Sequence, residues 1–466
     1  MELSLYHLLA LILALIFIIK RRLSKPISLP IIGHLHLLQD PIHQSLTLIA
    51  KKYGHVLHLR FGSRRVLVVS SPSVAKECFT KNDIIFANRP RLISGKYFGY
   101  NHTAPSLAPY GPRWREHRRF TAVHALSPSR LPSFSSDLRS LVLKLYSGSG
   151  DGFIKTDVRP MLFEMMMNVM AGLIAGKRYY GEGSADPEEG RRFRKVVEEV
   201  FLLSGASTVE DFIPAARWLR LGGAAKRMER VGQEMDKFFQ GLIEERRRVE
   251  KWKERNTIID TMLSMQENEP ENYSDVAIKG MMTSLLVAGT ETSTGTMEWV
   301  LALLLNHPET LKKAKDEIKE QETLRLFPAG PLLVPRESSE DCTVSKSYIP
   351  KGTMLLVNAY AMQRDPELWE SPLEFKPERF DGGIDGDQGY KYIPFGSGRR
   401  RCPGENLSWR VMGLTLGGLI QCFDWQRVGK ELVDLNEGVG LSMPMATSLQ
   451  AMYKPCQEMI TVLSQL

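Results

Sequence analysis

Cysteine is scarce in this chain, and its five cysteines form no pattern. Cys78, Cys342, Cys402, Cys422 and Cys456 are widely scattered, and no CxxC pair occurs. An odd, dispersed set argues against a disulfide framework, and the missing CxxC pairs argue against a zinc site. We therefore expect a reducing compartment for the main domain, with one thiol reserved for chemistry.

Linkers, low-complexity tracts and internal repeats are also absent. The length of 466 residues would allow two or three domains, but without such boundaries we expect one large domain behind an N-terminal segment. The composition, 43% hydrophobic and 24% charged, is that of an ordinary globular protein. A net charge of +8 fits an anionic membrane surface or an acidic protein partner, and it fits a mildly basic soluble surface equally well.

The targeting signal of the chain lies at its N-terminus. Leu3 to Ile19 is almost wholly apolar and is followed by a basic cluster at residues 20–25. A bilayer span needs at least about 17 such residues, and a cleaved signal peptide would carry its basic residues before the run, where this chain has Glu2. We expect a membrane anchor over residues 1–22, with its basic end in the cytosol, and a proline-containing connector over residues 23–34.

Beyond the connector, helical periodicity dominates and strands are few. Alternating or continuous apolar residues around Gly62 and Ser63 predict a β-hairpin of residues 56–60 and 65–70. The mostly apolar segment Asp275 to Leu305 predicts a helix of roughly 45 Å that crosses the whole domain. The other predicted elements are a helix capped by Ser73 through Cys78, a buried Met-rich helix at Glu164–Ala175, a solvated charged helix at Glu244–Arg255, and strands at Pro331–Pro335, Thr353–Val357 and Gly438–Tyr453. The fold class is mainly α with a small β portion.

The strongest chemical signal is the segment 395–404, FGSGRRRCPG, which presents Cys402 just before a helix beginning near Asn406. Gly398 and Gly404 allow backbone conformations and close approaches that a side chain would forbid. Three arginines and the helix N-terminus favour the thiolate form of the cysteine, which an axial haem ligand needs. The alternative is a buried cysteine after a basic turn, yet five fixed residue types at this spacing arise by chance less than about once in ten thousand such chains.

This loop resembles the haem-binding signature FxxGxRxCxG of the cytochrome P450 superfamily. With PIIGHLHLL at 30–38 and GKRYYGE at 176–182, the chain is most similar to plant endoplasmic-reticulum members of the isoflavone-hydroxylase-like branch, and the resemblance covers nearly its whole length. The resemblance implies the cytochrome P450 fold, with residues 35–466 as a haem-binding monooxygenase domain. It also implies haem b as the cofactor, Cys402 as the ligand of the iron, and cofactor contacts from Phe395, Gly398, Arg400 and Gly404.

A second match to the family is AGTETS at residues 288–293, inside the long apolar segment. An acid followed by a hydroxyl offers a proton path to bound dioxygen, and the resemblance implies that Thr292 and Glu291 are catalytic. Taken alone, such residues are more often a back-bonded hydroxyl and a salt bridge at the edge of the core.

Two further motifs imply cofactor contacts at a haem propionate. Trp114 and Arg118 fit the family pattern WxxxR, whose arginine can bind a carboxylate bidentately. Arg400 and Arg336 are further candidates for the same role. For Arg336, an ordinary arginine at the end of a strand is an equally good explanation.

Glu322 and Arg325 form an ExxR pair, and PERF follows at residues 377–380. Residues three apart on a helix share one face, although any surface helix supplies such spacing. By resemblance, Glu322, Arg325 and Arg379 interlock to hold the core around the haem loop, which is a structural role.

The chain departs from the family between these motifs. Thr292 and Glu322 are 30 positions apart, where the family has two further short helices and a loop. Pro308 to Leu326 therefore reads as one uninterrupted helix of roughly 28 Å, and we interpret the chain as shortened between residues 306 and 322. The ExxR pair then misses its place unless residues 319–321 unwind, and we expect a destabilised protein at best.

Four segments are expected to face the substrate by their position in the family pattern. They are the loop from Leu92 to Pro109, the region Phe201 to Phe212, the stretch after Phe327, and the hairpin tip at Met443 to Ala446. Phe98, Leu107, Leu332 and Met445 would give an apolar pocket, although each is individually more often plain core packing.

The resemblance implies a monooxygenase that inserts one oxygen atom from O₂ into a small apolar or aromatic substrate, with an isoflavonoid-like or phenolic plant metabolite as the closest guess. It implies electrons from NADPH through NADPH–cytochrome P450 reductase, contact with membrane lipid through the N-terminal helix, and no nucleic-acid partner. The expected location is the endoplasmic-reticulum membrane, single-pass, with the catalytic domain cytoplasmic. Two alternatives stay open: a haem-free, non-catalytic relative caused by the shortened segment, and a cysteine hydrolase that uses Cys402 with a histidine.

Overall fold

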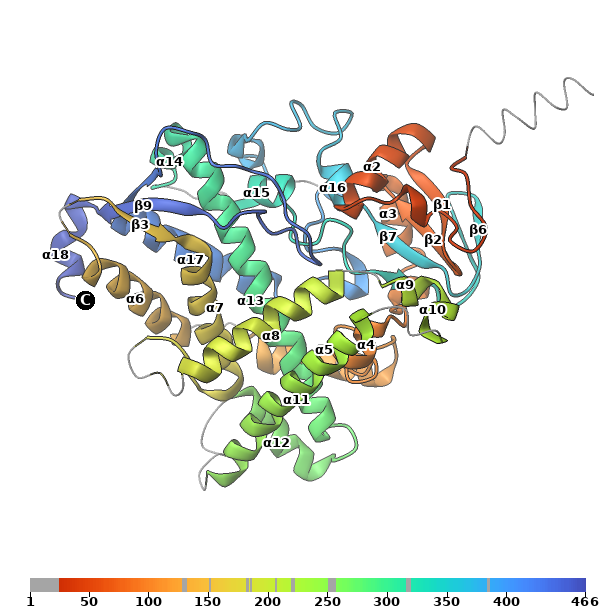
Figure 1. Cartoon of the computed structure of the whole chain (residues 1–466), viewed down its shortest axis with the longest axis horizontal. Helices are drawn as coiled ribbons and strands as arrows, with labels where there is room; N and C mark the ends of the chain where they lie inside the picture. Colours follow the sequence, from red (N-terminus) through yellow and green to blue (C-terminus); the bar gives the residue numbers. More distant parts are fainter. Residues whose placement is uncertain are drawn as a thin grey trace, which may run out of the picture.

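The computed structural model describes residues 25–127, 132–150, 152–181, 184, 187–205, 208–218, 223–249, 257–315, 320–383 and 386–466. The predicted anchor at residues 1–22 lies outside this part of the chain. Figure 1 shows a mainly helical body with small sheets toward two of its sides, which confirms the predicted fold class.

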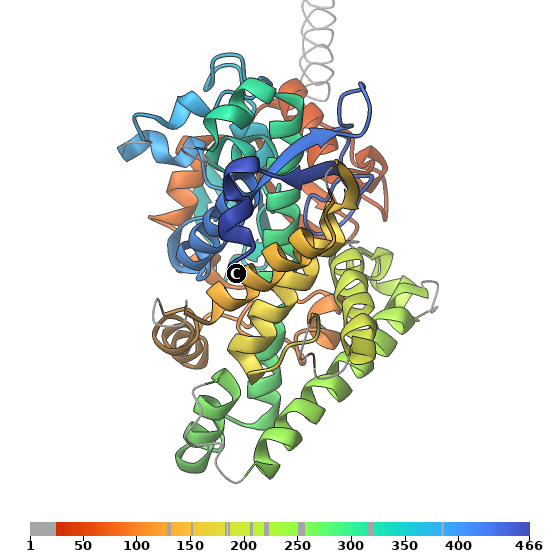
Figure 2. The same ribbon diagram turned by 90° about the vertical axis from the view of Figure 1, so that its left-hand side faces the viewer.

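Helices make up most of the described chain. Their bounds are α2 (Ile42–Tyr53), α3 (Pro72–Phe79), α4 (Ile93–Tyr97), α5 (Pro112–Phe120), α6 (Pro132–Ser147), α7 (Val158–Ala175), α8 (Pro187–Gly205), α9 (Val209–Phe212), α10 (Pro214–Trp218), α11 (Gly223–Arg248), α12 (Ile258–Asn268), α13 (Asp275–Asn306), α14 (Pro308–Lys313), α15 (Glu320–Leu326), α16 (Ala359–Gln363), α17 (Glu405–Cys422) and α18 (Ile460–Leu463). Figure 2 shows that α11 and α12 lie at one end of the molecule, far from the C-terminal strands.

The strands form three small sheets, in the orders β1-β2-β7-β4, β3-β9-β8 and β5-β6. Their bounds are β1 (Val56–Phe61), β2 (Arg64–Val69), β3 (Ile154–Asp157), β4 (Arg336–Glu337), β5 (Cys342–Val344), β6 (Ser347–Ile349), β7 (Met354–Val357), β8 (Phe423–Arg427) and β9 (Gln450–Pro455). The predicted hairpin is confirmed, because β1 and β2 pair antiparallel around Gly62 and Ser63.

Helix α13 is the central element, as the long apolar segment predicted. Ser274 caps its N-terminus by accepting a hydrogen bond from the backbone N–H of Ala277, and the helix continues for 32 residues. Its buried residues run from Ile278 to Leu305, and α7 lies against it. Among the described helices, α7 is the one long and apolar enough to cross a membrane, but 78% of it is buried inside the protein, which marks it as a core helix.

Several predicted boundaries were wrong. The cap of α3 is Ser71, not Ser73, because Pro72 occupies the first helical position. Residues 331–335 form turns, and the strand begins at Arg336. The C-terminal strand begins at Gln450, after turns and one isolated bridge between Glu437 and Met445. The cap of α3 was thus misplaced by two residues, whereas no strand forms at 331–335 and the C-terminal strand begins 12 residues later than predicted.

The charged run at 244–255 is less solvated than predicted over its described part. Glu244 and Arg248 do form an exposed pair four residues apart. Arg246, however, is buried and binds Asp260 of α12 with bonds of 2.6 to 2.9 Å. This arginine therefore joins two helices, because a buried guanidinium needs a carboxylate partner.

The prediction of one helix from Pro308 to Leu326 was wrong. Helix α14 ends at Lys313 with Ala314 as its cap, and α15 begins at Glu320. Lys315 turns back to Asp424 of β8, with 3.1 Å between its Nζ and a carboxylate oxygen. The helix is therefore broken at Ala314 and Lys315, whereas residues 320 and 321, which were expected to unwind, are helical.

Candidate functional site

The Cys402 loop is closed by its own backbone. The N–H of Cys402 donates to the carbonyl oxygen of Phe395 at 2.9 Å, directly before α17 begins. Gly398 has a φ of 69°, and a Cβ there would lie 2.3 Å from a carboxylate oxygen of Asp83, so glycine is required for two reasons. Gly404 has an ordinary φ of −89°, and a Cβ there would approach other protein atoms only to 3.9 Å, so its backbone conformation does not require glycine, and its contact with the cofactor stays a prediction.

Asp83 anchors this loop, and it was not identified from the sequence. Its buried carboxylate accepts from the backbone N–H of Arg399 at 3.1 Å and pairs with the guanidinium of the same residue at 2.7 Å. Arg336 lies 3.6 Å away on the other side. Asp83 and Arg399 are more than 300 positions apart in the chain, so no local sequence pattern could reveal their contact.

Burial raises the pKa of the Cys402 thiol. The backbone N–H of Gly404 and the cations of Arg118 and Arg401 act in the opposite direction, but they do not outweigh burial. Two arginines and the backbone at the start of the helix thus act in the predicted direction, toward the thiolate, but burial has the larger effect on the pKa of the metal-free thiol. A coordinating metal deprotonates a thiol outright, so iron itself would have to provide the thiolate form.

Three arginines gather beside the loop with too little negative charge around them. The guanidinium of Arg400 donates to the carbonyl oxygens of Ala87 and Ala108 at 2.7 and 2.5 Å. Burial, with help from Arg336, lowers the pKa of Arg400 to about 9. Burial likewise lowers the pKa of Arg336 to about 10, and burial, Arg400 and Arg336 together lower that of Arg89.

This excess of buried positive charge fits a dianionic ligand. Haem b carries two propionates, and Asp83 is the one carboxylate that approaches Arg336 within ion-pair distance in the described chain. Guanidinium groups bind carboxylates with strong, charge-assisted hydrogen bonds. The donor set therefore fits the propionate end of haem b.

Trp114 and Arg118 extend this cluster from α5. The indole N–H of Trp114 donates to the carbonyl oxygen of Pro105 at 3.1 Å, and the Arg400 guanidinium stacks on the ring at 4.3 Å. Arg118 donates to the carbonyl oxygen of Arg401 at 2.6 Å, next to Cys402. The structure thus brings the WxxxR motif and the cysteine loop together, as the resemblance implied.

One stripe of α13 is open although most of the helix is buried. Ala288 is exposed, and Ser284, Thr292 and Gly295 are partly exposed, while most neighbouring positions are covered. Ser284, Ala288 and Thr292 are spaced by four residues and so share one face of the helix. An exposed alanine inside a core helix indicates a hollow along this face, which is where a flat cofactor and its substrate would fit.

Thr292 and Glu291 lie at this stripe in different surroundings. The hydroxyl of Thr292 donates to the carbonyl oxygen of Ala288 at 2.6 Å, as the back-bonded alternative expected. Glu291 is buried, and one carboxylate oxygen pairs with Arg159 of α7. Its other oxygen has no hydrogen-bond partner among the described residues, and burial raises the pKa of this carboxyl despite Arg159.

Arg159 was not identified from the sequence. Besides Glu291 it binds Glu298 at 2.7 Å, and Glu298 also accepts the backbone N–H of Leu449 at 2.9 Å. Burial raises the pKa of Glu298, which Arg159 opposes. One arginine therefore joins α7, α13 and the segment before β9.

A small hollow, with room for about one water molecule, lies beside the Glu291–Thr292 pair. Its walls come from α13, from Phe327 and Ala329 after α15, and from residues 442–444. Two of the predicted substrate-facing segments thus meet the predicted catalytic pair. Phe98 and Met445, by contrast, are buried in core packing.

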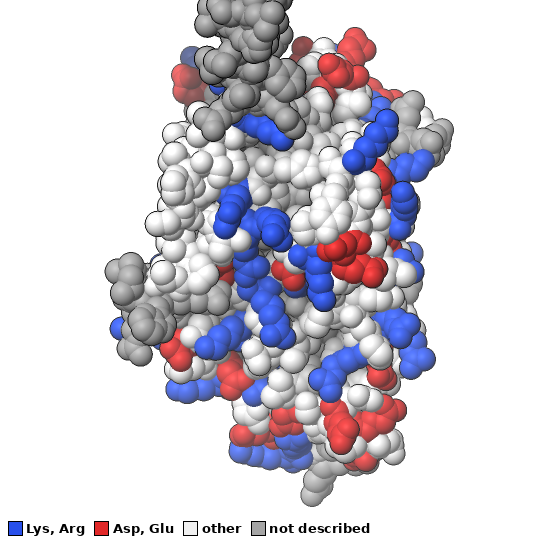
Figure 3. Space-filling model, turned by 90° about the vertical axis from the view of Figure 1, so that its right-hand side faces the viewer, with Lys and Arg blue, Asp and Glu red and all other residues white. Residues whose placement is uncertain are grey.

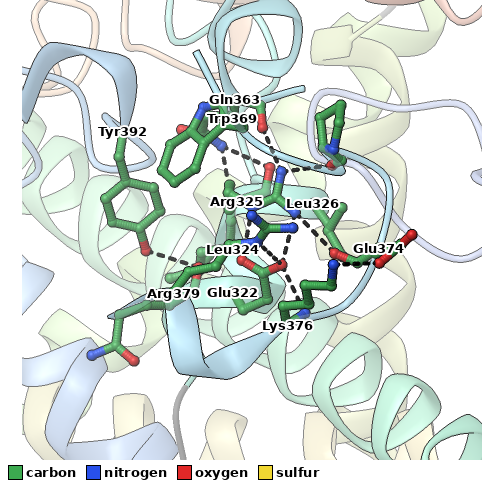
Figure 4. A network of polar contacts seen from close by, with 12 residues as sticks. Glu322, Leu324, Arg325, Leu326, Gln363, Trp369, Glu374, Lys376, Arg379 and Tyr392 are labelled. Carbon is green, nitrogen blue, oxygen red and sulfur yellow. Dashed lines mark hydrogen bonds and ion pairs between the residues drawn. The ribbon is translucent and has the colours of Figure 1, made fainter. Parts of the chain in front are cut away.

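The ExxR pair occupies the centre of a buried network (Figure 4). Arg325 binds both carboxylate oxygens of Glu322 at 2.7 Å and donates to the backbone carbonyls of Gln363 and Pro372 at 2.7 Å. Arg379 adds a contact of 3.3 Å to Glu322. The three predicted structural residues therefore do come together.

The residues just before this network carry a cost. Glu320 is buried, with a carboxylate oxygen that a Cβ at Gly413 of α17 would approach to 3.3 Å. Burial raises the pKa of its carboxyl to about 7. The side-chain oxygens of Gln321 and Thr323 are buried without a hydrogen-bond partner among the described residues, so the start of α15 is poorly satisfied.

Comparisons with known proteins agree with this geometry. The cytochrome P450 family profile matches residues 23–321 and 321–449. Cytochrome P450 81Q32 of Catharanthus roseus is 47% identical over 489 aligned positions, which cover 98% of this chain and 97% of that protein. Isoflavone 3'-hydroxylase of Medicago truncatula is 44% identical with 94% of each chain covered. (+)-Piperitol/(+)-sesamin synthase of Sesamum radiatum is 42% identical, covering 96% of this chain and 93% of the synthase.

The match also has a break where the sequence departs from the pattern. The two matched pieces of the family profile meet at residue 321, directly before Glu322. The 489 positions aligned to the Catharanthus protein exceed the 466 residues of this chain, so the alignment holds gaps on the side of this chain. Both observations support a shortened segment before the ExxR motif.

Proposed function

This chain belongs to the cytochrome P450 family, and from that membership we propose that it hydroxylates a small aromatic plant metabolite of the phenolic or isoflavonoid type. The observation that carries the proposal is the open stripe of α13, where Thr292 and Glu291 meet a hollow lined by Trp299, Phe327 and Met443. An apolar, aromatic wall with few polar groups suits a flat aromatic substrate.

Haem b, the cofactor of this family, supplies oxygen activation when bound. Cys402 would hold its iron, and Arg89, Arg336, Arg400 and Arg118 would bind and orient its propionates. The loop geometry favours this assignment because Gly398, Asp83 and the bond from Cys402 to Phe395 fix the thiol in one place. Preorganised ligands of this kind avoid a reorganisation cost on binding.

Thr292 and Glu291 would handle protons. The Thr292 hydroxyl donates its hydrogen to the carbonyl oxygen of Ala288. Its oxygen can still accept a hydrogen bond from a donor bound in the hollow. The second carboxylate oxygen of Glu291 is buried beside it without a partner in the described chain. A carboxyl whose pKa burial raises can carry a proton nearer to neutral pH, which suits a relay.

The substrate class rests on the relatives and on the hollow. One relative is named for hydroxylation of an isoflavone and another for synthesis of the lignans piperitol and sesamin. Isoflavone, the one substrate that these names give, is a multi-ring aromatic molecule. The stacked rings of Trp299 and Phe327, 3.9 Å apart, give the hollow a flat wall.

The partners and location follow from the same family. We place the protein at the endoplasmic-reticulum membrane, with electrons arriving from NADPH through NADPH–cytochrome P450 reductase. Figure 3 shows Lys and Arg gathered on the face that carries the β1–β2 hairpin and the start of the described chain. Arg60 and Arg65 are exposed and directly opposite each other in that hairpin. Two like charges in this position repel each other, and a bound anionic lipid headgroup would reduce this repulsion.

The main alternative is a haem-free protein disabled by the shortened segment. The docked network of Glu322, Arg325 and Arg379 argues against it. Family membership argues against the cysteine hydrolase.

Oxygen labelling tests the proposal. Membranes containing the protein, the reductase and NADPH are incubated under ¹⁸O₂ with an isoflavone, and products are analysed by mass spectrometry. The proposal predicts a product that carries one ¹⁸O atom and requires NADPH. Haem-loaded protein that consumes NADPH without labelling any isoflavone or lignan precursor would refute the substrate class.

A further inference from the structure

Two serine hydroxyls meet at the open stripe of α13. The hydroxyl of Ser284 donates to the hydroxyl oxygen of Ser106 at 3.1 Å, and the backbone N–H of Ser106 donates back to Ser284 at 3.2 Å. The two residues are 178 positions apart in the chain. This contact ties the loop before α5 to the central helix.

The position of the pair follows from the helix spacing. Ser284, Ala288 and Thr292 lie on one face of α13, and all three are at least partly exposed. Eight residues of α-helix separate Ser284 from Thr292, which corresponds to about 12 Å along the axis. The hydroxyl pair therefore stands at the same open stripe as the catalytic threonine, about two turns away.

The loop that carries Ser106 is held from its other side. The carbonyl oxygen of Ser106 accepts from Arg89 at 3.1 Å, that of Pro105 from Trp114 at 3.1 Å, and that of Ala108 from Arg400 at 2.5 Å. The carbonyls thus face the arginine cluster, and the side chain of Ser106 faces α13. A side chain fixed in this way is a preorganised binding group.

Hydrogen-bond accounting leaves one donor free. The Ser284 hydroxyl donates its hydrogen bond to the oxygen of Ser106. The exposed Ser106 hydroxyl can donate as well, and it has no acceptor among the described residues. The neighbouring open positions on the loop and helix, Leu107, Val287 and Ala288, are apolar. A single directional donor in apolar surroundings fixes the orientation of a ligand.

We propose that Ser106 and Ser284 bind a hydroxyl oxygen at the far end of an elongated aromatic substrate and thereby choose which ring reaches Thr292. The proposal rests on the proposed function, because it concerns the same site. It narrows the substrate to aromatic molecules with an oxygen substituent about 12 Å from the oxidised end, by the helix rise.

The test compares two probes that differ in one hydroxyl. Equilibrium dialysis measures the Kd of 7-hydroxyisoflavone and of unsubstituted isoflavone for the full-length protein in membranes. The variants are Ser106→Ala, Ser284→Ala and the conservative Ser284→Thr. The matched control is Ser147→Ala, an exposed serine of α6 whose hydroxyl bonds within its own helix.

Ser106→Ala and Ser284→Ala are each expected to raise the Kd of 7-hydroxyisoflavone about five- to tenfold, which is the effect of losing one hydrogen bond. In the same variants, the Kd of unsubstituted isoflavone should stay within about twofold of the wild-type value. Ser284→Thr keeps the hydroxyl and should bind 7-hydroxyisoflavone like the wild type. The control Ser147→Ala should bind both probes like the wild type. In turnover, the alanine variants should spread oxidation over both rings.

Equal weakening of both probes, no weakening, or no binding of 7-hydroxyisoflavone would overturn the proposal. Haem content is measured separately in every sample. Absent haem would contradict the proposed function, whereas dialysis needs no haem signal and still decides the role of the serine pair.

Discussion

Glu322 and Arg325 form a closed ion pair on α15, with two bonds of 2.7 Å and no exposure of either side chain. The pair forms although Glu322 follows Thr292 by only 30 positions. The chain achieves this by ending α14 at Lys313 instead of continuing as one helix. The network that supports the cysteine loop in the sequence-based prediction is therefore present, and the cost of the shortening falls on the residues directly before it.

Breaking the Glu322–Arg325 pair should destabilise the protein and the cysteine loop that holds the haem. Arg325→Met removes the two short ion-pair bonds of the buried Glu322 carboxylate and leaves it only the Arg379 contact of 3.3 Å, which costs about 3–5 kcal/mol. We expect a lower urea midpoint and loss of haem in the same sample. Lys312→Met is the control, since it removes a pair of the same spacing with exposed Glu309 and should cost less than about 1 kcal/mol. Equal effects of the two variants would contradict a special role for Arg325.

Glu320 should make stability depend on pH. The pKa of its carboxyl is about 7 in the folded protein against 4.5 for the unconstrained group. The unfolded chain therefore releases this proton first, and the free energy of unfolding falls as pH rises from about 4.5 through about 7. Glu320→Gln should recover about 3 kcal/mol at pH 8 and little at pH 4.5.

Urea unfolding of wild type and Glu320→Gln at several pH values measures this difference. Comparing the two proteins cancels the contributions of other titrating groups, such as Asp137, whose pKa burial raises to about 6. A constant difference between the curves at all pH values would show that folding leaves the pKa of Glu320 unchanged.

The Thr292 hydroxyl should determine how much product is formed per NADPH consumed. We expect Thr292→Ala to lower product formed per NADPH at least about tenfold, since a positioned proton donor contributes on this scale. Haem content should not change. Thr294→Ala is the control, because that hydroxyl is buried and bonds within α13 to the carbonyl oxygen of Thr290. Product per NADPH unchanged in Thr292→Ala would remove this residue from the proposed mechanism.

Arg159 should be essential for the core beside the site. Arg159→Met leaves Glu291 and Glu298 buried without their shared cation, and we expect a loss of about 3–5 kcal/mol in urea unfolding. Lys144→Met, which removes an exposed partner of Glu164 on the same helix α7, should change stability by less than about 1 kcal/mol. A similarly small loss for Arg159→Met would mean that the two carboxyls are protonated in the folded protein.

Local patterns predicted much of this fold. The alternation around Gly62 and Ser63 gave the first hairpin, and the apolar segment from Asp275 gave α13 almost to the residue. Periodicity failed at α14 and α15, because a turn forced by long-range docking leaves no mark on apolar spacing. The strand predicted at 331–335 failed for a related reason, since β4 forms where β7 offers a partner.

The site shows the same division. The cysteine loop and the ExxR pair were identified because family motifs are local in sequence. Asp83 and Arg159 were missed because their partners lie more than 130 residues away. The effect of the arginines on the pKa of the Cys402 thiol was predicted in the right direction, but the larger, opposing effect of burial depends on the fold and could not be read from the sequence.

The most direct test of the account is a reduced, carbon-monoxide-bound difference spectrum of the protein in membranes. The account predicts the long-wavelength Soret band of thiolate-bound haem in the wild type and in Cys422→Ser, and its loss in Cys402→Ser. A spectrum without this band in the wild type, or one that survives Cys402→Ser, would contradict the claim that the shortened chain holds haem b through Cys402.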